Sequence, residues 1–307
     1  PNPRQFKATV PNLPGLTVLF QRAGDIVASV RDGSVDFGIT GWDLVSERHG
    51  DNDHVLTLLP ELGYGFCTLN VIVPEGRKTV QRMVDLIDWQ AEIGCPLRVA
   101  TKYPVLTRAF FHQHGLNGVR LISAEGTLEV APTIGYADLI VDLVSTGTTL
   151  RDNRLRVLDD GLILESQACL IANRAAIKNS SEVLAVARHL LEFIVAHRRA
   201  AENVAISVNM RGESPETIAA RMFSRSVIGG LQGPTIAPVI TQNPGRTPWY
   251  AVNIVVRKNQ LAQAILELRE IGGSGVVVTP VAYIFEKEPQ ACKAMLAALE
   301  GSNAETV

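Results

Sequence analysis

The sequence predicts an α/β protein built from two lobes and a smaller third domain. Apolar runs of strand length alternate with amphipathic helices over residues 1–65, and the same alternation returns over residues 66–164. From residue 203 the predicted order changes to strand, helix, strand, strand, helix and strand. This change of pattern indicates that a separate domain follows the two lobes.

Two strand–helix pairs predict the first lobe. A short strand over Thr17–Phe20 precedes a helix over Asp25–Arg31, whose apolar residues fall on one face. The apolar run Asp36–Thr40 predicts a buried strand, and a second helix begins shortly after it. Because strands that alternate with helices are usually parallel, we expect a parallel sheet here.

The second lobe begins with the longer strand Phe66–Val73, at which the chain leaves the first lobe. The elements that follow repeat the alternation and are strand Leu97–Ala100, helix Pro104–His114, strand Val119–Ser123 and a helix around Leu128–Ile134. An apolar run from Leu139 to Val144 then predicts a buried strand.

The chain next returns to the first lobe. The loosely alternating run Leu162–Ile171 brings it back, and the long helix Val183–Arg199 follows, capped by Ser180 or Ser181. A lobe that is left and re-entered predicts two lobes facing across a cleft, as in type II periplasmic binding proteins. We expect a ligand in that cleft, because α/β folds bind ligands at the carboxyl ends of strands.

Six short elements predict the third domain. They are strand Val204–Met210, helix Pro215–Phe223, strands Thr235–Ile240 and Tyr250–Val256, helix Gln260–Leu268 and strand Val276–Val281. This βαββαβ order is ferredoxin-like, and the Pro/Gly-rich segment Gln242–Pro248 predicts the hairpin loop between its middle strands. The expected boundaries are 1–65 with 165–202 for the first lobe, 66–164 for the second and 203–307 for the third domain.

Composition narrows the classes of function. The 307 residues carry a formal net charge of −2 with interspersed signs, which argues against a nucleic-acid binder. No apolar run approaches membrane-spanning length, and the N-terminus lacks the apolar core of a signal peptide. The four cysteines show no CxxC spacing, which is typical of a cytoplasmic protein and indicates neither a disulfide framework nor a zinc site.

The strongest candidate for a ligand site is the loop Ser145–Thr149. It follows a buried strand and contains only small hydroxylated residues and one glycine. Backbone N–H groups and hydroxyls in such a loop can surround a phosphate. Asp142 and Asp138 precede it, and carboxylates beside a phosphate suit the hydroxyls of a sugar or a Mg²⁺ ion. The sequence therefore predicts a sugar phosphate, with an ordinary βα turn as the alternative.

Residues around this loop resemble a known signature. They are Glu129, Gly135, Ala137, Ile140, Asp142, Leu143, Thr146, Gly147, Thr149 and Leu150. Their spacing resembles that of the ATP phosphoribosyltransferase family. Segments elsewhere resemble the same family and are Arg22-x-x-Asp25-Ile26, Asp36-Phe37-Gly38-Ile39-Thr40-Gly41-x-Asp43, Arg98-Val99-Ala100-Thr101-Lys102-Tyr103-Pro104 and Glu165-Ser166-x-Ala168. The likeness runs nearly end to end.

The resemblance implies a glycosyltransferase that catalyses the first step of histidine biosynthesis. N1 of the adenine of ATP attacks C1 of phosphoribosyl pyrophosphate, and pyrophosphate leaves with Mg²⁺ bound to it. The third domain resembles the ACT-like regulatory domain of the long-form enzymes. Feedback inhibition by histidine and a homo-oligomer, from dimer to hexamer, are therefore implied as well. The sequence assigns no ligands to the Mg²⁺.

Roles for individual residues also follow from the resemblance. The catalytic candidates are Asp142, near the ribose hydroxyls, and Glu129, facing the ribose or the pyrophosphate. The residues expected to bind phosphoribosyl pyrophosphate are Ser145, Thr146, Gly147, Thr148 and Thr149. Those expected at ATP are Arg22, Thr40, Gly41, Lys102 and Tyr103. Those expected at histidine are Leu231, Gly233, Thr235 and Ser274.

Each of these roles has a plainer alternative. Glu129 can complement a helix dipole. Thr40 and Gly41 can form an ordinary βα turn in which Asp43 supports the first turn of the helix that follows. Lys102 can reach a phosphate and Tyr103 can stack on adenine, or they can be a surface lysine and a half-buried tyrosine.

Three other interpretations compete, one for a pair of histidines and two for the whole chain. His112 and His114 could be taken for a metal site. Residues two apart on a helix project in different directions, however, so the two side chains cannot bind the same ion. A two-lobed solute-binding protein shares the expected fold, although it would carry a secretion signal. A catalytically inactive regulatory paralogue is the third, because nothing in Pro1–Pro11 matches the first strand expected of the family. We expect instead that the given sequence lacks the N-terminal segment that carries this strand.

Overall fold

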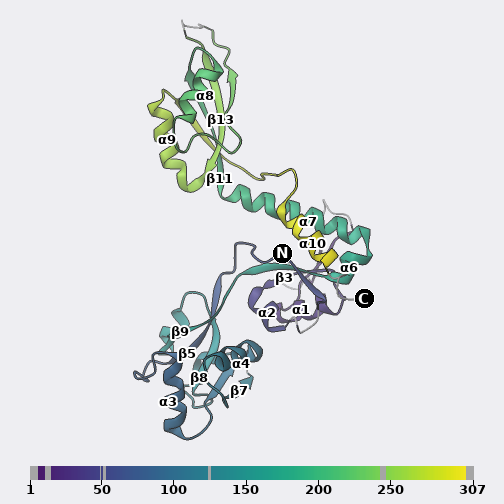
Figure 1. Ribbon diagram of the computed structural model, residues 1–307, viewed down its shortest axis with the longest axis vertical. Helices are drawn as coiled ribbons and strands as arrows, with labels where there is room; N and C mark the ends of the chain where they lie inside the picture. The colour runs from purple at the N-terminus through teal and green to yellow at the C-terminus, as the bar shows by residue number, and fades with distance from the viewer. Residues whose placement is uncertain are drawn as a thin grey trace. The chain divides into compact units, whose positions relative to one another are not determined.

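The computed structural model describes residues 6–10, 15–48, 50, 53–123, 126–242 and 247–301 (Figure 1). The chain divides into two compact units. One comprises the residues up to 187 together with those from 297 onward, and the other comprises residues 188–296. Helix α7 (Ser181–Ala201) belongs to both units, so the expected domain boundary at residue 203 stays a prediction.

The first unit contains two lobes, each built on its own sheet. Lobe I holds a three-stranded sheet in the order β3 (Phe37–Gly41), β10 (Ala168–Asn173), β4 (Val55–Leu59). Helices α1 (Ala23–Arg31) and α2 (Trp42–Arg48) pack against this sheet. Their apolar residues form one cluster with those of β10. A separate antiparallel pair joins β1 (Lys7–Thr9) to β2 (Thr17–Leu19).

The expected parallel sheet of lobe I is wrong. β10 lies between β3 and β4 and pairs antiparallel with both of them. Local strand–helix alternation could not reveal this, because the central strand arrives from a distant part of the chain after the second lobe is complete.

Lobe II holds a mixed five-stranded sheet in the order β7-β6-β8-β5-β9. Its strands are β5 (Cys67–Pro74), β6 (Arg98–Thr101), β7 (Arg120–Ser123), β8 (Leu139–Val144) and β9 (Leu155–Ser166). β6 pairs parallel with β7 and with β8, whereas β5 runs antiparallel to β8 and β9. The carboxyl ends of β6, β7 and β8 therefore meet at one edge of the sheet.

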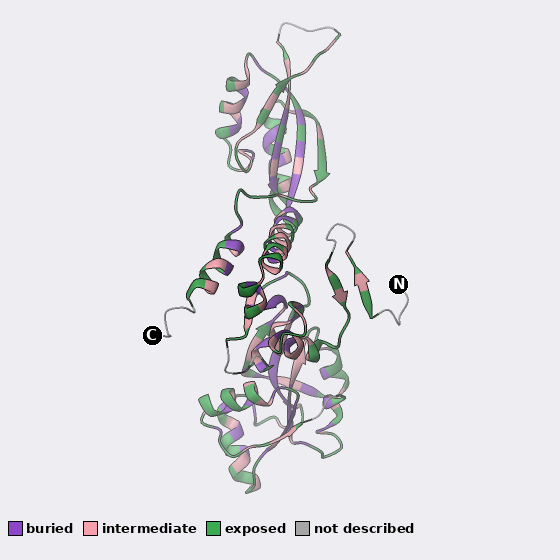
Figure 2. Cartoon of the chain, turned by 90° about the vertical axis from the view of Figure 1, so that its right-hand side faces the viewer, coloured by how far each residue is buried: buried purple, intermediate pink, exposed green. Residues whose placement is uncertain are grey.

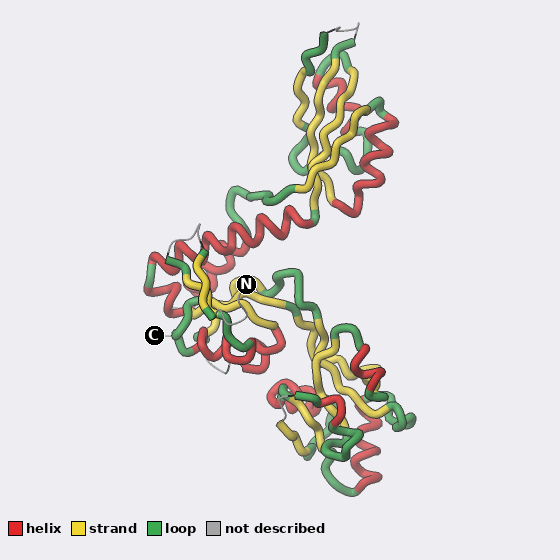
Figure 3. The backbone as a smooth tube through the Cα atoms, turned by 180° about the vertical axis from the view of Figure 1, so that it is seen from behind, coloured by secondary structure: helices red, strands yellow, loops and turns green. Residues whose placement is uncertain are grey.

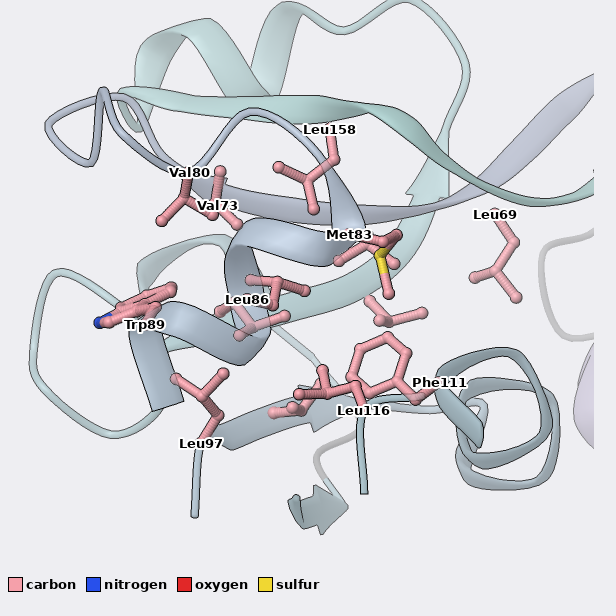
Figure 4. Close-up of a cluster of buried hydrophobic side chains, with 14 of the residues drawn as sticks. Leu69, Val73, Val80, Met83, Leu86, Trp89, Leu97, Phe111, Leu116 and Leu158 are labelled. Atoms are coloured by element: carbon pink, nitrogen blue, oxygen red, sulfur yellow. The ribbon is translucent and has the colours of Figure 1, made fainter. Parts of the chain in front are cut away.

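The core of lobe II lies between its sheet and the helices α3 (Met83–Ile93) and α4 (Pro104–Gln113). Figure 4 shows Met83, Leu86 and Trp89 of α3 within this cluster. These residues recur every three positions and so occupy one face of the helix. Their burial fixes α3 against the strands that present the loop Ser145–Thr149.

The second unit has the expected ferredoxin-like order, which the structure confirms. Its elements are β11 (Asn203–Arg211), α8 (Pro215–Phe223), β12 (Thr235–Pro238), β13 (Trp249–Arg257), α9 (Leu261–Glu270) and β14 (Ser274–Pro280). The strands form an antiparallel sheet in the order β12-β13-β11-β14 (Figure 3). Buried residues alternate with exposed ones along β11, and both helices pack on the buried face (Figure 2).

The helix expected around Leu128–Ile134 is wrong in extent. Only a single 3₁₀ turn, η1 (Leu128–Val130), forms there. Pro132 lacks a backbone donor and Gly135 adopts a φ of 72°, so the chain turns away instead of continuing as a helix.

The return to lobe I also differs from the expectation. β9 starts at Leu155, before the expected start at Leu162, and Gln167 separates it from β10. The middle of the expected hairpin loop Gln242–Pro248 lies outside the described residues, as does most of Pro1–Pro11.

The remaining helices are α5 (Thr148–Asp152), α6 (Arg174–Asn179), η2 (Lys258–Gln260) and α10 (Gln290–Gly301). Within the described ranges, no helix has both the length and the apolar character that crossing a bilayer requires.

Two neighbours on α3 test the core. Leu86 is fully buried, whereas Ile87 is 39% exposed. Leu86→Ala is expected to lower the free energy of unfolding by about 2–5 kcal/mol, because it leaves a cavity. Ile87→Ala, the matched control, is expected to change it by less than about 1 kcal/mol. Urea denaturation followed by circular dichroism measures both, and equal losses would contradict the assignment of the core.

Candidate functional site

The candidate site lies at the carboxyl edge of the parallel strands in lobe II. Lys102 directly follows β6, Glu129 lies in η1 after β7, and the loop Ser145–Thr149 follows β8. β6 is hydrogen-bonded to both β7 and β8. The mixed sheet thus brings together three chain segments that are far apart in the sequence, at the edge where α/β proteins bind ligands.

The loop Ser145–Thr149 is largely exposed and turns at a glycine in the left-handed conformation. Gly147 has a φ of 69°, a left-handed conformation that favours glycine, and α5 starts immediately after it. Ser145, Thr146, Thr148 and Thr149 are exposed. The hydroxyls of Thr146 and Thr148 lie 3.2 Å apart. All four hydroxyl-bearing residues are therefore open to a ligand.

One cation beside the loop was missed by sequence reasoning. Nη2 of Arg151 donates to Oγ1 of Thr148 at 3.4 Å. The position of Arg151 in the sequence, one helical turn after the start of α5, could have indicated this, because a basic residue there can reach back to an anion bound in the loop.

Asp142 sits in a half-buried position on β8, opposite Asn70 of β5. One carboxylate oxygen accepts the N–H of Leu143 at 2.8 Å. Burial raises the pKa of Asp142 above its ordinary value, and the charge of Glu129 acts in the same direction, while Leu143 and Lys102 oppose it. Glu129 and Lys102 thus both lie within electrostatic reach of Asp142.

Asp138 on the same segment has a structural environment. Its carboxylate accepts from Arg98 three times, at 2.8 Å from the backbone N–H, 3.2 Å from Nε and 2.8 Å from Nη2. Burial opposes ionisation of Asp138, but these hydrogen bonds outweigh it and hold its pKa below the ordinary value. Asp138 is thus paired with Arg98 within the fold.

The ATP candidates of lobe I lie at the start of α1 and the end of β3. Arg22 precedes α1 and is exposed. Thr40 is 6% exposed, and its hydroxyl donates to the carbonyl of Ala23 at 3.2 Å. An added Cβ on Gly41 would lie 2.2 Å from Oδ1 of Asp43, so the absence of a side chain at Gly41 makes room for that carboxylate.

Tyr103 is buried in this structure. It is 3% exposed, and its hydroxyl donates to Oδ2 of Asp43 at 2.7 Å. Burial raises its pKa well above the ordinary value, and the hydrogen bond to Asp43 adds to the effect. The ring belongs to the buried apolar cluster of lobe II, and stacking on adenine stays a prediction. Asp43 itself was treated from sequence only as support for its own helix.

A cavity of about 550 Å³ opens where the two lobes join. Its lining combines Ser145 of the candidate loop with the aromatic rings of Trp42 and Phe66 and with the segment Glu165–Gln167. Phe66 is 64% exposed. Sequence reasoning did not assign Trp42 or Phe66, although Trp42 directly follows Gly41 in a segment singled out there.

A second cavity, of about 580 Å³, lies within residues 188–296. Leu231, Gly233 and Thr235 line it, together with Asn253 of β13. Ser274 is not part of the lining, and its hydroxyl donates to the carbonyl of Asn209 at 3.4 Å. The structure thus brings together three of the four residues expected at histidine.

Metal ligands do not gather among the residues that the structure describes: no group of three His, Cys, Asp or Glu side chains there could hold an ion. Nδ1 of His114 lies 2.9 Å from the carbonyl of Phe110, one helical turn earlier.

Two family models match the chain. The model described as ATP phosphoribosyltransferase matches residues 22–193. The model described as HisG, C-terminal domain, matches residues 200–283. Together they span both the lobes and the second unit.

Named relatives match over most of their length. The chain is 40% identical over 294 residues to ATP phosphoribosyltransferase 2, chloroplastic, from Arabidopsis thaliana, which covers 94% of this chain and 71% of the relative. It is 35% identical over 289 residues to ATP phosphoribosyltransferase from Rhodopseudomonas palustris (strain HaA2), which covers 93% of this chain and 85% of the relative.

Solved structures give weaker likenesses. The ATP phosphoribosyl transferase (HisG:HisZ) complex from Thermotoga maritima matches at 24% identity and a TM-score of 0.44, over 56% of this chain and 80% of that chain. A Gly52Ala mutant of arginine-bound ArgBP from T. maritima matches at 14% identity and a TM-score of 0.36, over 60% and 90%. Neither TM-score supports a conclusion about this chain.

Gly41→Ala tests the packing at the end of β3. The added Cβ would collide with the Asp43 carboxylate, so we expect a loss of about 1–3 kcal/mol in the free energy of unfolding. Gly76→Ala is the control, because nothing lies within 4 Å of the Cβ added there. Urea denaturation compares them, and a Gly41→Ala midpoint equal to that of Gly76→Ala would count against this account of Gly41.

Proposed function

The chain belongs to the ATP phosphoribosyltransferase family, and from that membership we propose how its residues carry out the reaction of the family. It is a transferase of the glycosyltransferase class that joins ATP to phosphoribosyl pyrophosphate, the first step of histidine biosynthesis. The matches to named transferases favour this enzyme over a solute-binding protein or an inactive paralogue.

The observation that carries the residue assignments is the shared edge of β6, β7 and β8. The hydroxyl-bearing residues of the loop Ser145–Thr149 are exposed there, and Asp142 precedes the loop on β8. Lys102 and Glu129 lie within electrostatic reach of Asp142. We propose that the loop binds the 5-phosphate of phosphoribosyl pyrophosphate and that Asp142 contacts its ribose. Lys102 then offers a positive charge to a substrate phosphate.

The chemical demand on this edge is to stabilise a ribosyl carbon that becomes positively charged as pyrophosphate leaves. Asp142 and Glu129 are the carboxylates within reach of it. Because Asp142 is held in a poorly solvating environment, a nearby cation gains more from its negative charge than it would from an exposed carboxylate. Orientation of N1 of adenine towards C1 supplies the other large contribution.

Mg²⁺ fits the donors at this edge. Asp142 and Glu129 offer the hard oxygen atoms that this ion prefers, and an ion that also binds substrate phosphates needs no complete protein cage. We propose that these two carboxylates lie nearest the ion. When bound, Mg²⁺ neutralises negative charge on the departing pyrophosphate.

The cavity where the lobes join is the proposed place for ATP. The rings of Trp42 and Phe66 suit a purine, and Ser145 connects the cavity to the phosphate loop. Arg22, Thr40, Gly41, Lys102 and Tyr103 remain the proposed ATP residues, although none of the five is among the residues that line this cavity.

Regulation is proposed for the second unit. The cavity lined by Leu231, Gly233, Thr235 and Asn253 is large enough to admit an amino acid, and the first three are residues expected at histidine. Feedback inhibition by histidine and assembly into a homo-oligomer, from dimer to hexamer, are part of this proposal. A cytoplasmic location is proposed too, although the Arabidopsis relatives are named as chloroplastic.

Asp142 and Asp138 make a matched pair. The pKa of Asp142 is raised in the folded protein, so its ionised form contributes no stability above the unfolded pKa, and Asp142→Asn should not lower stability at neutral pH. We expect this change to cut kcat/KM by about a hundredfold or more.

The pKa of Asp138 is lowered, so its ionised form stabilises the fold above the unfolded pKa and loses that effect as pH falls through the folded value. Asp138→Asn should lower the free energy of unfolding by about 1–3 kcal/mol while kcat/KM changes little. Pyrophosphate release and urea denaturation measure the two properties. Full activity of Asp142→Asn would remove Asp142 from the site.

Histidine binding is tested in the cavity of the second unit. Leu231→Ala and Thr235→Ala each remove lining atoms and should raise the histidine concentration for half-inhibition about tenfold, which corresponds to about 1.4 kcal/mol. Thr279→Ala on β14 lies in the same sheet but outside the lining and serves as control. Inhibition that is equal in all three variants would assign the inhibitor to another place.

A further inference from the structure

Helix α2 of lobe I carries two buried carboxylates. Asp43 is 4% exposed and Glu47 is 9% exposed. Residues four apart lie on the same face of a helix, one turn from each other. Charged side chains are rarely buried without specific partners, and both acids find theirs across the boundary between the lobes.

Asp43 joins three elements. Its Oδ2 accepts the hydroxyl of Tyr103 at 2.7 Å, and its Oδ1 accepts the hydroxyl of Ser166 at 2.7 Å. Oγ of Ser166 in turn accepts the backbone N–H of Asp43 at 3.0 Å. Ser166 ends β9, where the chain passes from lobe II to lobe I, and Tyr103 precedes α4 of lobe II.

Glu47 of α2 binds the first turn of α4, the helix that follows Tyr103. Its Oε1 accepts the N–H of Val105 at 2.9 Å, and its Oε2 accepts the N–H of Leu106 at 3.0 Å. The first N–H groups of a helix have no partner within it, and the Tyr103 side chain makes no capping bond to them. A carboxylate from the other lobe therefore takes the role of the N-cap and also complements the positive end of the helix.

Lys102 lies directly beside the residues so held. Its neighbours Thr101 and Tyr103 are 0% and 3% exposed, whereas Lys102 itself is exposed. The N–H of Tyr103 donates to Oγ1 of Thr101 at 2.9 Å, and this oxygen lies 3.5 Å from Oγ1 of Thr107. The backbone on both sides of Lys102 is thus fixed while its side chain stays free to meet a ligand.

We propose that Asp43 and Glu47 form an interlobe clamp that positions Lys102 for binding a substrate phosphate. The clamp consists of the two carboxylates of α2 and the turn Thr101–Leu106 that they hold. Both acids are positioning residues, since they act through Lys102. The inference rests on the proposed function, because it takes Lys102 to contact substrate.

Kinetics of the full chain test the link to Lys102. Asp43→Asn keeps the shape of the side chain but weakens its acceptors, and should raise KM for one of the two polyanionic substrates about tenfold, with a smaller change in kcat. In a Lys102→Ala background the same substitution should raise KM no further, because the two act as a unit. Tyr103→Phe removes the other end of the hydrogen bond and should reproduce the increase. Asp88→Asn, an exposed acid on α3, is the control.

Hydrogen exchange tests the clamp without reference to activity. Glu47→Gln should speed amide exchange in the segment containing Val105 and Leu106 about tenfold, because a neutral amide is a weaker acceptor for two donors. Glu92→Gln on α3, an exposed acid, should leave it unchanged.

Each outcome bears on a different part of the proposal. Exchange that stays slow in Glu47→Gln overturns the clamp itself. Effects of Asp43→Asn and Lys102→Ala that add fully overturn the link between them, and show a structural role alone. A Lys102→Ala variant with unchanged KM values overturns the proposed role of Lys102 and the positioning claim with it, even when the exchange result stands.

Discussion

The hydrogen bond from the Tyr103 hydroxyl to the buried Asp43 carboxylate joins the two lobes of the first unit. It connects a residue before α4 with the first turn of α2, and the Ser166 hydroxyl completes the coordination of the same carboxylate. Gly41 has to lack a side chain for Asp43 to reach this position. A phenol of ordinary pKa is already protonated at physiological pH, so the Tyr103 hydroxyl is a donor there, and burial raises its pKa further.

Asp138 and Asp142 lie on one short segment, but their surroundings shift their pKa values in opposite directions. Asp138 receives three hydrogen bonds from Arg98 and is stabilised as an anion. Asp142 receives one backbone hydrogen bond, faces the charge of Glu129 and is strained towards its protonated form. Burial of the ionised Asp142 carboxylate lowers the stability of the folded protein at neutral pH, and the same burial would strengthen its attraction to the cationic ribosyl carbon of the proposed reaction. The same residue type therefore has opposite effects on the fold at positions four apart.

Local signals predicted most of the secondary structure. Pro215 at the start of α8 and the alternation along β11 agree with the structure because these features act within a few residues. The candidate loop was recognisable for the same reason, since Gly147 and the flanking hydroxyls are contiguous.

Contacts between distant segments could not be predicted in this way. The place of β10 between β3 and β4 depends on pairing across the whole second lobe. The partners of Asp43 and Glu47, at Tyr103, Ser166 and the first turn of α4, become neighbours only in the folded chain. A single acid after a glycine looks from sequence like ordinary support for its own helix. The failed parallel sheet and the unrecognised role of Asp43 thus have one cause: long-range pairing leaves no local signal.

The insertion of β10 has a consequence for the order in which the protein takes shape during synthesis. All strands of lobe II lie between residues 67 and 166, so that lobe can assemble as soon as its own segment has left the ribosome. Lobe I begins earlier in the chain, yet β3 and β4 have no strand between them until residues 168–173 emerge. Until then, β3 and β4 of the nascent chain each have an unpaired edge on the side that β10 will occupy. Such edges are prone to premature pairing with other strands.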